Sequence, residues 1–383
     1  MAFGANNLVN FYLLPEPNSD APAELLTPEP RSYLGSVQQL RLNTEYAAAL
    51  FDGKIELHWI EAPEDDSTPE SVLLPQKGGS AITCMDLTTN FCIYGDALGG
   101  LTYFLLEDWK VMSQFKHVIG IKKIFADATG TRVVFFDDKG DVLLYTAVND
   151  AVYEVGQVNA DAGATVLWDN RPGDQGTFAL VTRDEISTYV FRANYYTGPR
   201  VDRLGTTPRD PALEPLLLLN GTLHCLSSSG RLATQVLGSH DAIANAAAVD
   251  RNPKRAAQQY IALGRFREAL APATAAQDDQ IWGSLCSAAV HNLAISTAIH
   301  AYRACGKIGM VHTLASIQYV EDRNLLCGHV CLLQKDIDKA EGFFLDSARP
   351  VEALVSNQEE ERKKERRRRK KKEEEDDEER RRR

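Results

Sequence analysis

Apolar and polar residues alternate with a period of two in the first part of the chain, up to about Leu237. The alternating runs are short and separated by Gly, Asp and Asn, which is the pattern of β-strands joined by tight turns. Between Tyr46–Phe51 and Lys54–Glu61, the pair Asp52-Gly53 tolerates the positive φ angles of a hairpin turn. The other predicted strands are Val37–Leu42, Ala81–Leu87, Phe91–Tyr94, Leu101–Leu106, Ile121–Ala126, Arg132–Phe136, Val142–Tyr145, Ala164–Trp168, Thr177–Thr182, Ile186–Phe191, Pro215–Leu219, Thr222–Leu226 and Arg231–Leu237.

The predicted strands form five units of three, and the turn between the last two strands of each unit recurs at a nearly constant spacing. These turns lie at Gly53, Gly100, Gly140, Asp184 and Gly230, at intervals of 47, 40, 44 and 46 residues. A repeat of about 40–45 residues that holds about four short strands is typical of propeller blades. With a partial unit at Leu8–Leu14, the pattern predicts an incomplete, WD40-like β-propeller over residues 1–238. Glu61–Ser80 and Arg192–Pro215 are predicted to be loops.

The apolar period becomes helical after Gly238. Short loops and alanine-rich faces favour helices stacked in antiparallel pairs, and Pro253 suits a first helical turn. Residues 239–357 are therefore predicted to form an α-solenoid of tetratricopeptide-like helical hairpins. The predicted helices are Lys254–Leu263, Arg265–Ala271, Gln280–His291, Leu293–Arg303, Lys307–Gln318, Glu321–Leu333, Asp336–Asp346 and Val351–Asn357.

Charge is concentrated at the end of the chain, where residues 358–383 are predicted to form a charged low-complexity tail. Residues 359–383 contain 14 basic and 11 acidic side chains and nothing else. The whole chain has a formal net charge of −11, so the residues before the tail carry about −14. An acidic body repels phosphate, which argues against general binding of nucleic acid. Arg366–Lys372 alone matches a nuclear-localisation or nucleic-acid patch, but a charged low-complexity segment with no apolar face is the favoured interpretation.

Cysteine usage and hydropathy limit the cellular compartments with which the sequence is compatible. No apolar run reaches the ~18 residues of a membrane span, and the N-terminus lacks the pattern of a signal peptide. The seven cysteines show no paired framework, which fits reduced, cytosolic thiols.

Two segments come nearest to a ligand site. Gly95–Gly100 lacks the lysine and the following helix of a phosphate-binding loop, which favours a hairpin turn. Cys327 and Cys331 lie four residues apart on one helical face and could share a metal ion. His329 points elsewhere on that helix, and no second Cys/His pair supplies the remaining tetrahedral ligands. Packing of small buried side chains is the alternative interpretation.

The sequence also shows no convincing group of histidine and carboxylate side chains for general acid–base catalysis. His291 and His300, on consecutive predicted helices, are the only histidines expected to lie near each other. The acidic pairs Asp65-Asp66, Asp137-Asp138 and Asp278-Asp279 fall at predicted turns or helix starts, where turn formation and N-capping explain them. Trp168-Asp169 closes an early strand and does not mark the end of a blade. We therefore predict no catalytic, cofactor-binding or metal-ligating residue and no cofactor.

Several long stretches of the chain carry a more specific signal, over roughly residues 5–357. They are Glu45–Glu61, Phe91–Lys110, Ile121–Val155, Pro215–Cys225 and Ala298–His329. The chain resembles the WD-repeat subunits of intraflagellar transport complex A. This resemblance implies two propellers followed by a long solenoid, of which the present sequence corresponds to the later part of the second propeller and the start of the solenoid. We accordingly expect the chain to represent part of a longer protein.

The resemblance also implies a function. It implies a non-catalytic scaffold that supports retrograde ciliary transport, cilium assembly and ciliary entry of membrane proteins through protein–protein binding. The implied partners are other complex A subunits, the retrograde dynein machinery and adaptors for membrane-protein cargo, with no nucleic acid and no membrane span. The implied locations are the cilium or flagellum, the basal body and the cytoplasm.

Three alternatives remain open from the sequence. A coat or tethering subunit of endomembrane vesicles has the same propeller–solenoid architecture. A propeller enzyme, such as a peptidase or a quinoprotein, would need a hydrolase domain or a cofactor-binding ring, and the sequence indicates neither. A nuclear or nucleic-acid adaptor would act through Glu359–Arg383.

Overall fold

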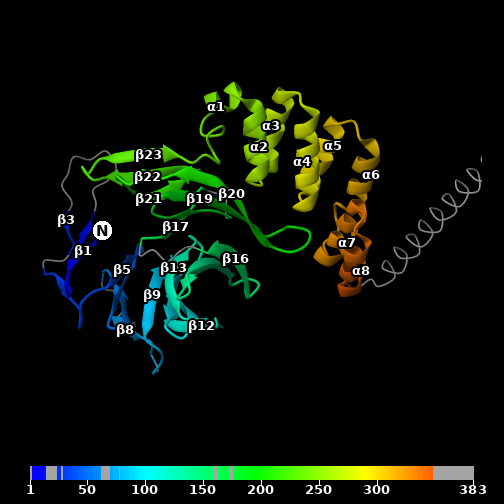
Figure 1. The fold of residues 1–383 in the computed structure, drawn as a ribbon. Helices are drawn as coiled ribbons and strands as arrows, with labels where there is room; N and C mark the ends of the chain where they lie inside the picture. Colours follow the sequence, from blue (N-terminus) through cyan, green and yellow to red (C-terminus); the bar gives the residue numbers. More distant parts are fainter. Residues whose placement is uncertain are drawn as a thin grey trace, which may run out of the picture. The chain divides into compact units, whose positions relative to one another are not determined.

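The computed structural model describes residues 2–13, 24–26, 29–61, 70–76, 78–157, 163–171 and 176–347. The chain separates into two compact units (Figure 1). The first comprises Met1–Tyr189 and Gly205–Leu237 and is called the propeller unit here. The second comprises Val190–Leu204 and Gly238–Arg383 and is called the helical unit. The division differs from a single boundary at residue 238, because fifteen residues from inside the predicted propeller group with the helices.

The propeller unit is a six-bladed β-propeller built from antiparallel sheets, numbered here as blades 1 to 6 in chain order (Figure 1). Blade 1 contains β1 (Ala2–Ala5), β2 (Leu8–Leu13), β3 (Glu24–Leu25) and β4 (Arg31–Ser32), and blade 2 contains β5 (Gln39–Leu42), β6 (Tyr46–Phe51), β7 (Lys54–Trp59) and β8 (Ser71–Leu74). Blade 3 contains β9 (Ile82–Leu87), β10 (Phe91–Asp96), β11 (Gly100–Leu105) and β12 (Lys110–Lys116), and blade 4 contains β13 (Ile121–Ala126), β14 (Arg132–Asp137), β15 (Asp141–Thr146) and β16 (Ala151–Gln157). Blade 5 contains β17 (Thr165–Trp168), β18 (Thr177–Val181), β19 (Glu185–Arg192) and β20 (Arg200–Pro208), and blade 6 contains β21 (Leu213–Leu219), β22 (Thr222–Ser227) and β23 (Leu232–Val236).

The first strand of each blade from 2 to 6 faces the axis of the propeller. In blades 2 to 5 the strands pair in chain order, so the first strand lies at one edge of its sheet and the fourth at the other. Strands β5, β9, β13 and β17 each contact the first strand of the following blade, the last of these contacts being with β21. Such contacts between successive edges require these edges to converge.

Apolar side chains fill the spaces between neighbouring blades. Blades 3 and 4, for example, share a cluster that includes Ile93, Tyr103, Phe135 and Tyr145. Phe135 is fully buried, and burial of a side chain of this size stabilises the fold by about 1.5–3 kcal/mol. The central strands of a blade are therefore apolar on both faces, which explains why Phe91–Asp96 and Arg132–Asp137 could be recognised in the sequence.

The sequence prediction of a propeller is confirmed, and two of its loops are corrected. Glu61–Ser80 was predicted to be a loop, but its residues Ser71–Leu74 form the outer strand β8. Arg192–Pro215 was also predicted to be a loop, but Arg200–Pro208 forms the outer strand β20. Outer strands are exposed on much of their surface, so they need no apolar alternation and escape a search for it. The partial unit predicted at Leu8–Leu14 corresponds to β2 of blade 1.

The helical unit consists of consecutive antiparallel helices. Neighbours from α1 to α6 pack against each other, as do α7 and α8. Its side-chain caps follow the sequence: Asn252 accepts the N–H of Arg255, and Pro253 occupies the first turn of α2. Gly264, at φ +78°, turns the chain between α2 and α3. The short α1 was not predicted, and the predicted helix Val351–Asn357 lies outside the described residues. The helices are α1 (Ala246–Arg251), α2 (Pro253–Ala262), α3 (Phe266–Ala276), α4 (Asp279–His291), α5 (Ile295–Ala304), α6 (Ile308–Ile317), α7 (Arg323–Gln334) and α8 (Ile337–Asp346).

The segment Val190–Leu204, the distal part of the β19–β20 hairpin, completes the helical unit. Tyr196 donates its backbone N–H to the carbonyl oxygen of His291 at 2.8 Å, and its ring stacks on the imidazole at a centroid distance of 5.1 Å. The Arg192 guanidinium donates to the carbonyl oxygen of Ala262 at 2.5 Å, at the C-terminal end of α2. The distal part of this hairpin therefore lies between propeller segments in the sequence but packs with the helical unit.

All seven cysteines lie within the described residues and carry free thiols. None of the helices in the described part of the chain combines the length and the apolar character that crossing a bilayer would require.

Candidate protein-interaction site at the propeller axis

A cavity of about 570 Å³ opens in the propeller unit where the first strands of blades 2 to 6 converge. It is lined by the ends of these strands and the turns that follow them. The lining residues are Asn43, Thr44, Asp86, Leu87, Thr88, Thr89, Phe125, Ala126, Asp127, Ala128, Val166, Leu167, Trp168, Asn170, Leu216, Leu217 and Leu218. Because five blades contribute, the shape of the cavity depends on how neighbouring blades are held in register.

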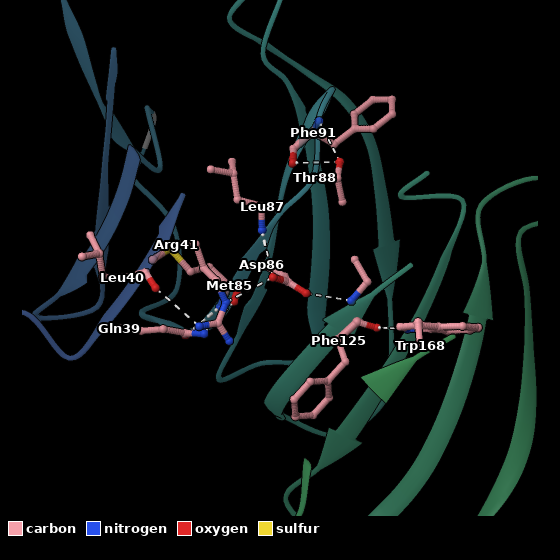
Figure 2. Close-up of polar contacts among 11 residues, drawn as sticks. Gln39, Leu40, Arg41, Met85, Asp86, Leu87, Thr88, Phe91, Phe125 and Trp168 are labelled. Atoms are coloured by element: carbon pink, nitrogen blue, oxygen red, sulfur yellow. Dashed lines mark hydrogen bonds and ion pairs between the residues drawn. The ribbon is translucent and has the colours of Figure 1, made fainter. Parts of the chain in front are cut away.

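Asp86 is the polar centre of the cavity wall (Figure 2). One carboxylate oxygen accepts the N–H of Ala126 in blade 4 at 2.8 Å, and the other accepts from Arg41 Nε in blade 2 at 3.2 Å. The second oxygen also accepts the N–H of Leu87 at 3.1 Å. Burial raises the pKa of the Asp86 carboxyl even though Arg41 and these donors favour the charged form. Asp86 thus joins three successive blades.

Two further side chains join blade 2 to blade 3. The Gln39 amide donates to the carbonyl oxygen of Met85 at 2.8 Å and accepts the N–H of the same residue at 3.2 Å (Figure 2). Asn43 Nδ2 donates to the carbonyl oxygen of Thr88 at 3.0 Å. These bonds give the edge backbone of β9 partners that a sheet neighbour would otherwise supply.

Side-chain hydrogen bonds to the backbone of a neighbouring blade also join blades 4, 5 and 6. Trp168 Nε1 donates to the carbonyl oxygen of Phe125 at 3.1 Å, as Figure 2 shows. The Asp169 carboxylate accepts the N–H groups of Asn220 at 2.6 Å and Gly221 at 3.1 Å, in the β21–β22 turn. The Trp168-Asp169 pair therefore has a structural role between blades, although it does not end one.

The cavity can recognise a partner by shape and apolar contact. Its carboxylates are engaged, since Asp127 accepts from Thr129, Thr131 and the N–H of Arg132. Of the residues that line it, none is a histidine, cysteine, serine or lysine. Leu216 and Leu217 retain 50% and 41% of their surface exposed, so the wall contributed by blade 6 is apolar and accessible.

Gly95–Gly100 forms the β10–β11 hairpin, as the sequence predicted. Asp96 Oδ1 accepts the N–H of Leu98 at 2.8 Å and of Gly100 at 2.7 Å. Gly99 has φ +86°, which favours glycine there. The acidic side chain is therefore used to close the turn.

Cys327 and Cys331 are both buried in α7. Burial raises the pKa of the Cys327 thiol, and it raises that of Cys331 to about 11. His329 contacts the edge of the Phe344 ring at a centroid distance of 5.4 Å. Neutral thiols within a packed helix interface suit the packing interpretation. Within the described residues, no group of three or more His, Cys, Asp or Glu side chains is arranged to hold a metal ion.

His291 and His300 have different surroundings. His291 lies against Tyr195 and Tyr196, and burial lowers the pKa of its imidazole. His300 lies exposed on α5. His291 thus contributes to the packing of the hairpin on the helices.

The remaining acidic pairs behave largely as predicted. Asp137 Oδ1 accepts the N–H groups of Lys139 and Asp141, both at 2.9 Å, and closes the β14–β15 turn. Asp278 is the N-cap of α4 and accepts the N–H of Gln280 at 2.8 Å. Asp65-Asp66 and the charged tail lie outside the described residues.

Sequence analysis did not identify the residues that join the blades. Gln39, Arg41, Asp86 and Asp169 are polar residues within or next to apolar strands, and that position is the only signal of their role. Gln39, Asp86 and Asp169 bond to backbone groups roughly one blade away, and Arg41 bonds to the Asp86 carboxylate. Residue types alone cannot indicate such partners.

Comparison with known proteins decides the family. The family model described as WDR19 second beta-propeller matches residues 1–240. The chain belongs to this family. Its similarity to the curated relatives continues past the propeller unit: the chain is 37% identical over 358 residues to WD repeat-containing protein 19 of Homo sapiens, covering 92% of this chain and 26% of that protein. It is 29% identical over 331 residues to WD repeat-containing protein dyf-2 of Caenorhabditis elegans, covering 84% of this chain and 23% of that protein.

The chain of this WDR19-propeller family thus spans about a quarter of the length of the human and nematode relatives. Among solved structures, Kluyveromyces lactis Hsv2 is similar at 10% identity and a TM-score of 0.42, covering 54% of this chain and 69% of that one. A likeness of that degree supports no argument about function.

Proposed function

We propose that this chain is part of a non-catalytic scaffold subunit of intraflagellar transport complex A. In this role it supports retrograde ciliary transport, cilium assembly and ciliary entry of membrane proteins through protein–protein binding. The observation that carries the proposal is the 37% identity to human WD repeat-containing protein 19 across 92% of the chain. That similarity includes both the propeller unit and the helical unit.

The site at the propeller axis supports a binding role. Its polar side chains bond to the backbone of neighbouring blades, which leaves shape and the exposed leucines Leu216 and Leu217 to meet a partner. Catalysis would need a nucleophile, a base or a charge-stabilising group free to act on a substrate. Binding through a rigid, preformed surface needs none of these.

The helical unit extends the proposed scaffold. Its antiparallel helices are proposed to begin a tetratricopeptide-like solenoid, whose repeated hairpins form long binding surfaces. The proposed partners are other complex A subunits, the retrograde dynein machinery and adaptors for membrane-protein cargo. The proposed locations are the cilium, the basal body and the cytoplasm.

A replacement experiment tests this function with the chain as part of a longer protein. The segment of human WD repeat-containing protein 19 that this chain matches is exchanged for this chain, in ciliated cells that lack the human protein. The expected result is recovery of cilium length and of a ciliary membrane receptor, with the unaltered human protein as positive control and a segment deletion as negative control.

Co-purification with the chimera separates the proposal from its main alternative. Recovery of complex A subunits supports the scaffold role. Recovery of Golgi or lysosomal coat subunits in their place, without restored cilia, would reject it in favour of an endomembrane coat. Turnover of a peptide or sugar substrate by the purified chain, abolished by a single substitution, would reject the non-catalytic role.

A further inference from the structure

Two thiols from neighbouring helices lie against each other in the helical unit. Cys286 is in the middle of α4, and Cys305 is the C-cap residue of α5. The two helices pack side by side (Figure 1). Their two Sγ atoms are 3.8 Å apart, although the residues are separated by 19 positions in the chain. Neither residue lines the cavity at the propeller axis, so this pair is a feature distinct from the site described above.

The two thiols differ in their access to solvent. Cys286 is 2% exposed, whereas Cys305 is the one cysteine of the seven that is not buried. Burial raises the pKa of the Cys286 thiol to about 12, Cys305 acts in the same direction, and the Lys307 cation opposes both. Cys286 is consequently a neutral, shielded thiol. Cys305 is the sulfur that a dissolved reagent reaches first.

The backbone around Cys305 allows the two sulfurs to approach. A disulfide bond is about 2.05 Å long, so the Sγ atoms must move together by about 1.8 Å. Cys305 ends its helix, and Gly306 turns the chain toward α6 at φ +68°. Among the described residues, no atom apart from its chain neighbours lies within 4 Å of the position that a Cβ atom on Gly306 would occupy. A turn bordered by open space adjusts more easily than the middle of a packed helix.

We propose that Cys286 and Cys305 are a modification site, at which hydrogen peroxide converts the two thiols to a disulfide within one chain. The bond ties the middle of α4 to the end of α5 and thereby fixes this helical hairpin. A dithiol reductant reverses the modification by attack on the accessible Cys305 sulfur. The proposal is independent of the ciliary role proposed above.

The oxidation proceeds in two steps. In the first, the Cys305 thiolate attacks one oxygen of hydrogen peroxide, so that an S–O bond forms and the O–O bond breaks. The departing hydroxide takes up the proton that the thiol released, which leaves a sulfenic acid on Cys305 and one water. In the second, the Cys286 sulfur attacks the Cys305 sulfur, the S–S bond forms and the S–O bond breaks. The Cys286 proton and the leaving hydroxide make a second water, and the two electrons lost by the sulfurs reduce the peroxide.

Packing of small thiols between helices is the alternative interpretation of this pair. Cys327 and Cys331 represent that alternative within the same unit, since both are buried in α7. A pair of thiols that only packs should resist a dissolved oxidant as these two do. Cys327 and Cys331 are therefore an internal control for the proposed site.

The test begins with the full, folded and reduced chain, which is treated with hydrogen peroxide. The remaining thiols are then alkylated under denaturing conditions, and tryptic peptides are analysed by mass spectrometry. Trypsin separates the two cysteines, because Cys286 lies in Glu268–Arg303 and Cys305 lies in Ala304–Lys307. We expect these two peptides to become linked, at least about tenfold faster than Cys327 and Cys331 lose their thiols. Dithiothreitol should release the linked peptides, and hydrogen exchange within α4 and α5 should be slower in the oxidised chain.

Two substitutions separate the roles of the thiols. In Cys286→Ser the sulfenic acid on Cys305 has no thiol to resolve it, so we expect dimedone to trap it there. In Cys305→Ser the accessible sulfur is absent, and we expect neither a linked peptide nor a dimedone adduct on Cys286. Cys327→Ser is the matched control and should form the disulfide at the rate of the unaltered chain. Circular dichroism checks the fold of each variant, and the peptides of the unaltered chain test the proposal independently of the variants.

Each other outcome overturns the proposal. Oxidation of Cys327 and Cys331 as fast as that of Cys286 and Cys305 would mean that the pair has no special reactivity. A linked peptide that forms only after denaturation would show that the folded chain holds the sulfurs apart. A bond between two chains through Cys305, seen as a dimer on a non-reducing gel, would assign the reactivity to the exposed thiol alone.

Discussion

Neighbouring blades and neighbouring helices in this protein are held together by different kinds of contact. Between blades, polar side chains such as Gln39, Asp86 and Trp168 bond to the backbone of a neighbouring first strand. Between helices, small residues allow close approach: alanines recur in the core of the helical unit, and Gly328 lies directly against the Phe344 ring. The difference follows from the backbone. An edge strand has unpaired groups to offer, whereas the interior of a helix has already used its own.

This comparison teaches where each unit is sensitive. The placement of one blade against the next depends on a few specific hydrogen bonds as well as on the volume of the buried apolar side chains. The placement of one helix against the next depends mainly on the volume of the side chains between them. The helical unit also has polar attachments of the propeller type, among them the bond from the Arg192 side chain of the β19–β20 hairpin to the carbonyl of Ala262. Four tests follow, from the largest expected effect to the smallest.

Loss of apolar volume between blades should have the largest effect. Phe135→Ala empties a fully buried position between blades 3 and 4 and is expected to lower the free energy of unfolding of the propeller unit by about 3–5 kcal/mol. Phe344→Ala is the matched change in the helical unit. Urea unfolding followed by far-ultraviolet circular dichroism should show one transition shifted by each variant. A shift of the same transition by both would mean that the units do not unfold separately.

Acid should destabilise the propeller unit through His58, which is completely buried. Its Nδ1–H donates to the carbonyl oxygen of Trp59 at 2.7 Å, and Tyr33 O–H donates to its Nε2 at 2.8 Å. Burial lowers the pKa of His58 from 6.5 to about 4. The unfolded chain therefore takes up a proton first, and stability is lost as pH falls from about 6.5 to about 4.

The size of this acid effect follows from the shift in pKa, and is about 3 kcal/mol for a change of this order. The measurement is the urea midpoint of the propeller transition at a series of pH values. His58→Gln should remove most of the slope between pH 6.5 and 4. An unchanged slope in that variant would assign the acid sensitivity to other groups.

Removal of the hairpin attachment should have an intermediate effect on the helical unit. Arg192 is 11% exposed in its side chain and bonds to Asp202 at 2.6 Å as well as to Ala262. Arg192→Ala is expected to cost about 2–3 kcal/mol, since it removes the guanidinium that donates to the Ala262 carbonyl and leaves Asp202 with Arg200 as its remaining ionic partner. Arg200→Ala, at a side chain 47% exposed above the Tyr195 ring, should cost at most about 1 kcal/mol. Equal losses in the two variants would contradict a specific role for Arg192.

Neutralisation of the cavity carboxylate should have the smallest effect. Asp86→Asn keeps an oxygen for the N–H of Ala126 but loses the ionic bond to Arg41. Because burial already raises the pKa of Asp86, the neutral amide recovers part of the desolvation penalty, and the expected loss is about 1 kcal/mol. Asp86→Leu removes both bonds and should cost more in the same urea measurement. A loss in the asparagine variant as large as that in the leucine variant would show that the charge itself is essential.

The sequence was most informative where side chains are buried on a regular period. Tyr46–Phe51 and Ile121–Ala126 were predicted with the bounds that the structure has, because each is a short, mostly apolar run that a turn follows. Strand β20 was missed, since Arg200–Pro208 is largely exposed and contains charged residues and a proline. A strand of this kind is recognisable only once its neighbour β19 is known to need a partner.

The cavity was harder to predict than the strands around it. Its walls come from five blades spread over residues 43–218, and no local motif brings those positions together. The turn role of Asp96 could be anticipated from the glycines beside it. The role of Asp86 could not, because its decisive partner, the N–H of Ala126, is 40 positions away and is a backbone group like any other.

The assignment of Val190–Leu204 to the helical unit has a consequence for synthesis of the chain. These residues leave the ribosome before every helix they contact, and the bond from Arg323 to Ala193 spans 130 positions. At about 5–20 residues per second, that distance corresponds to a delay of roughly 10 s. During this interval Tyr195 and Tyr196 have no helical surface to cover them. An expression clone that ends at Leu237 never supplies the helices that cover these tyrosines. Such a clone should therefore also shorten the β19–β20 hairpin, so that the isolated propeller unit does not expose them.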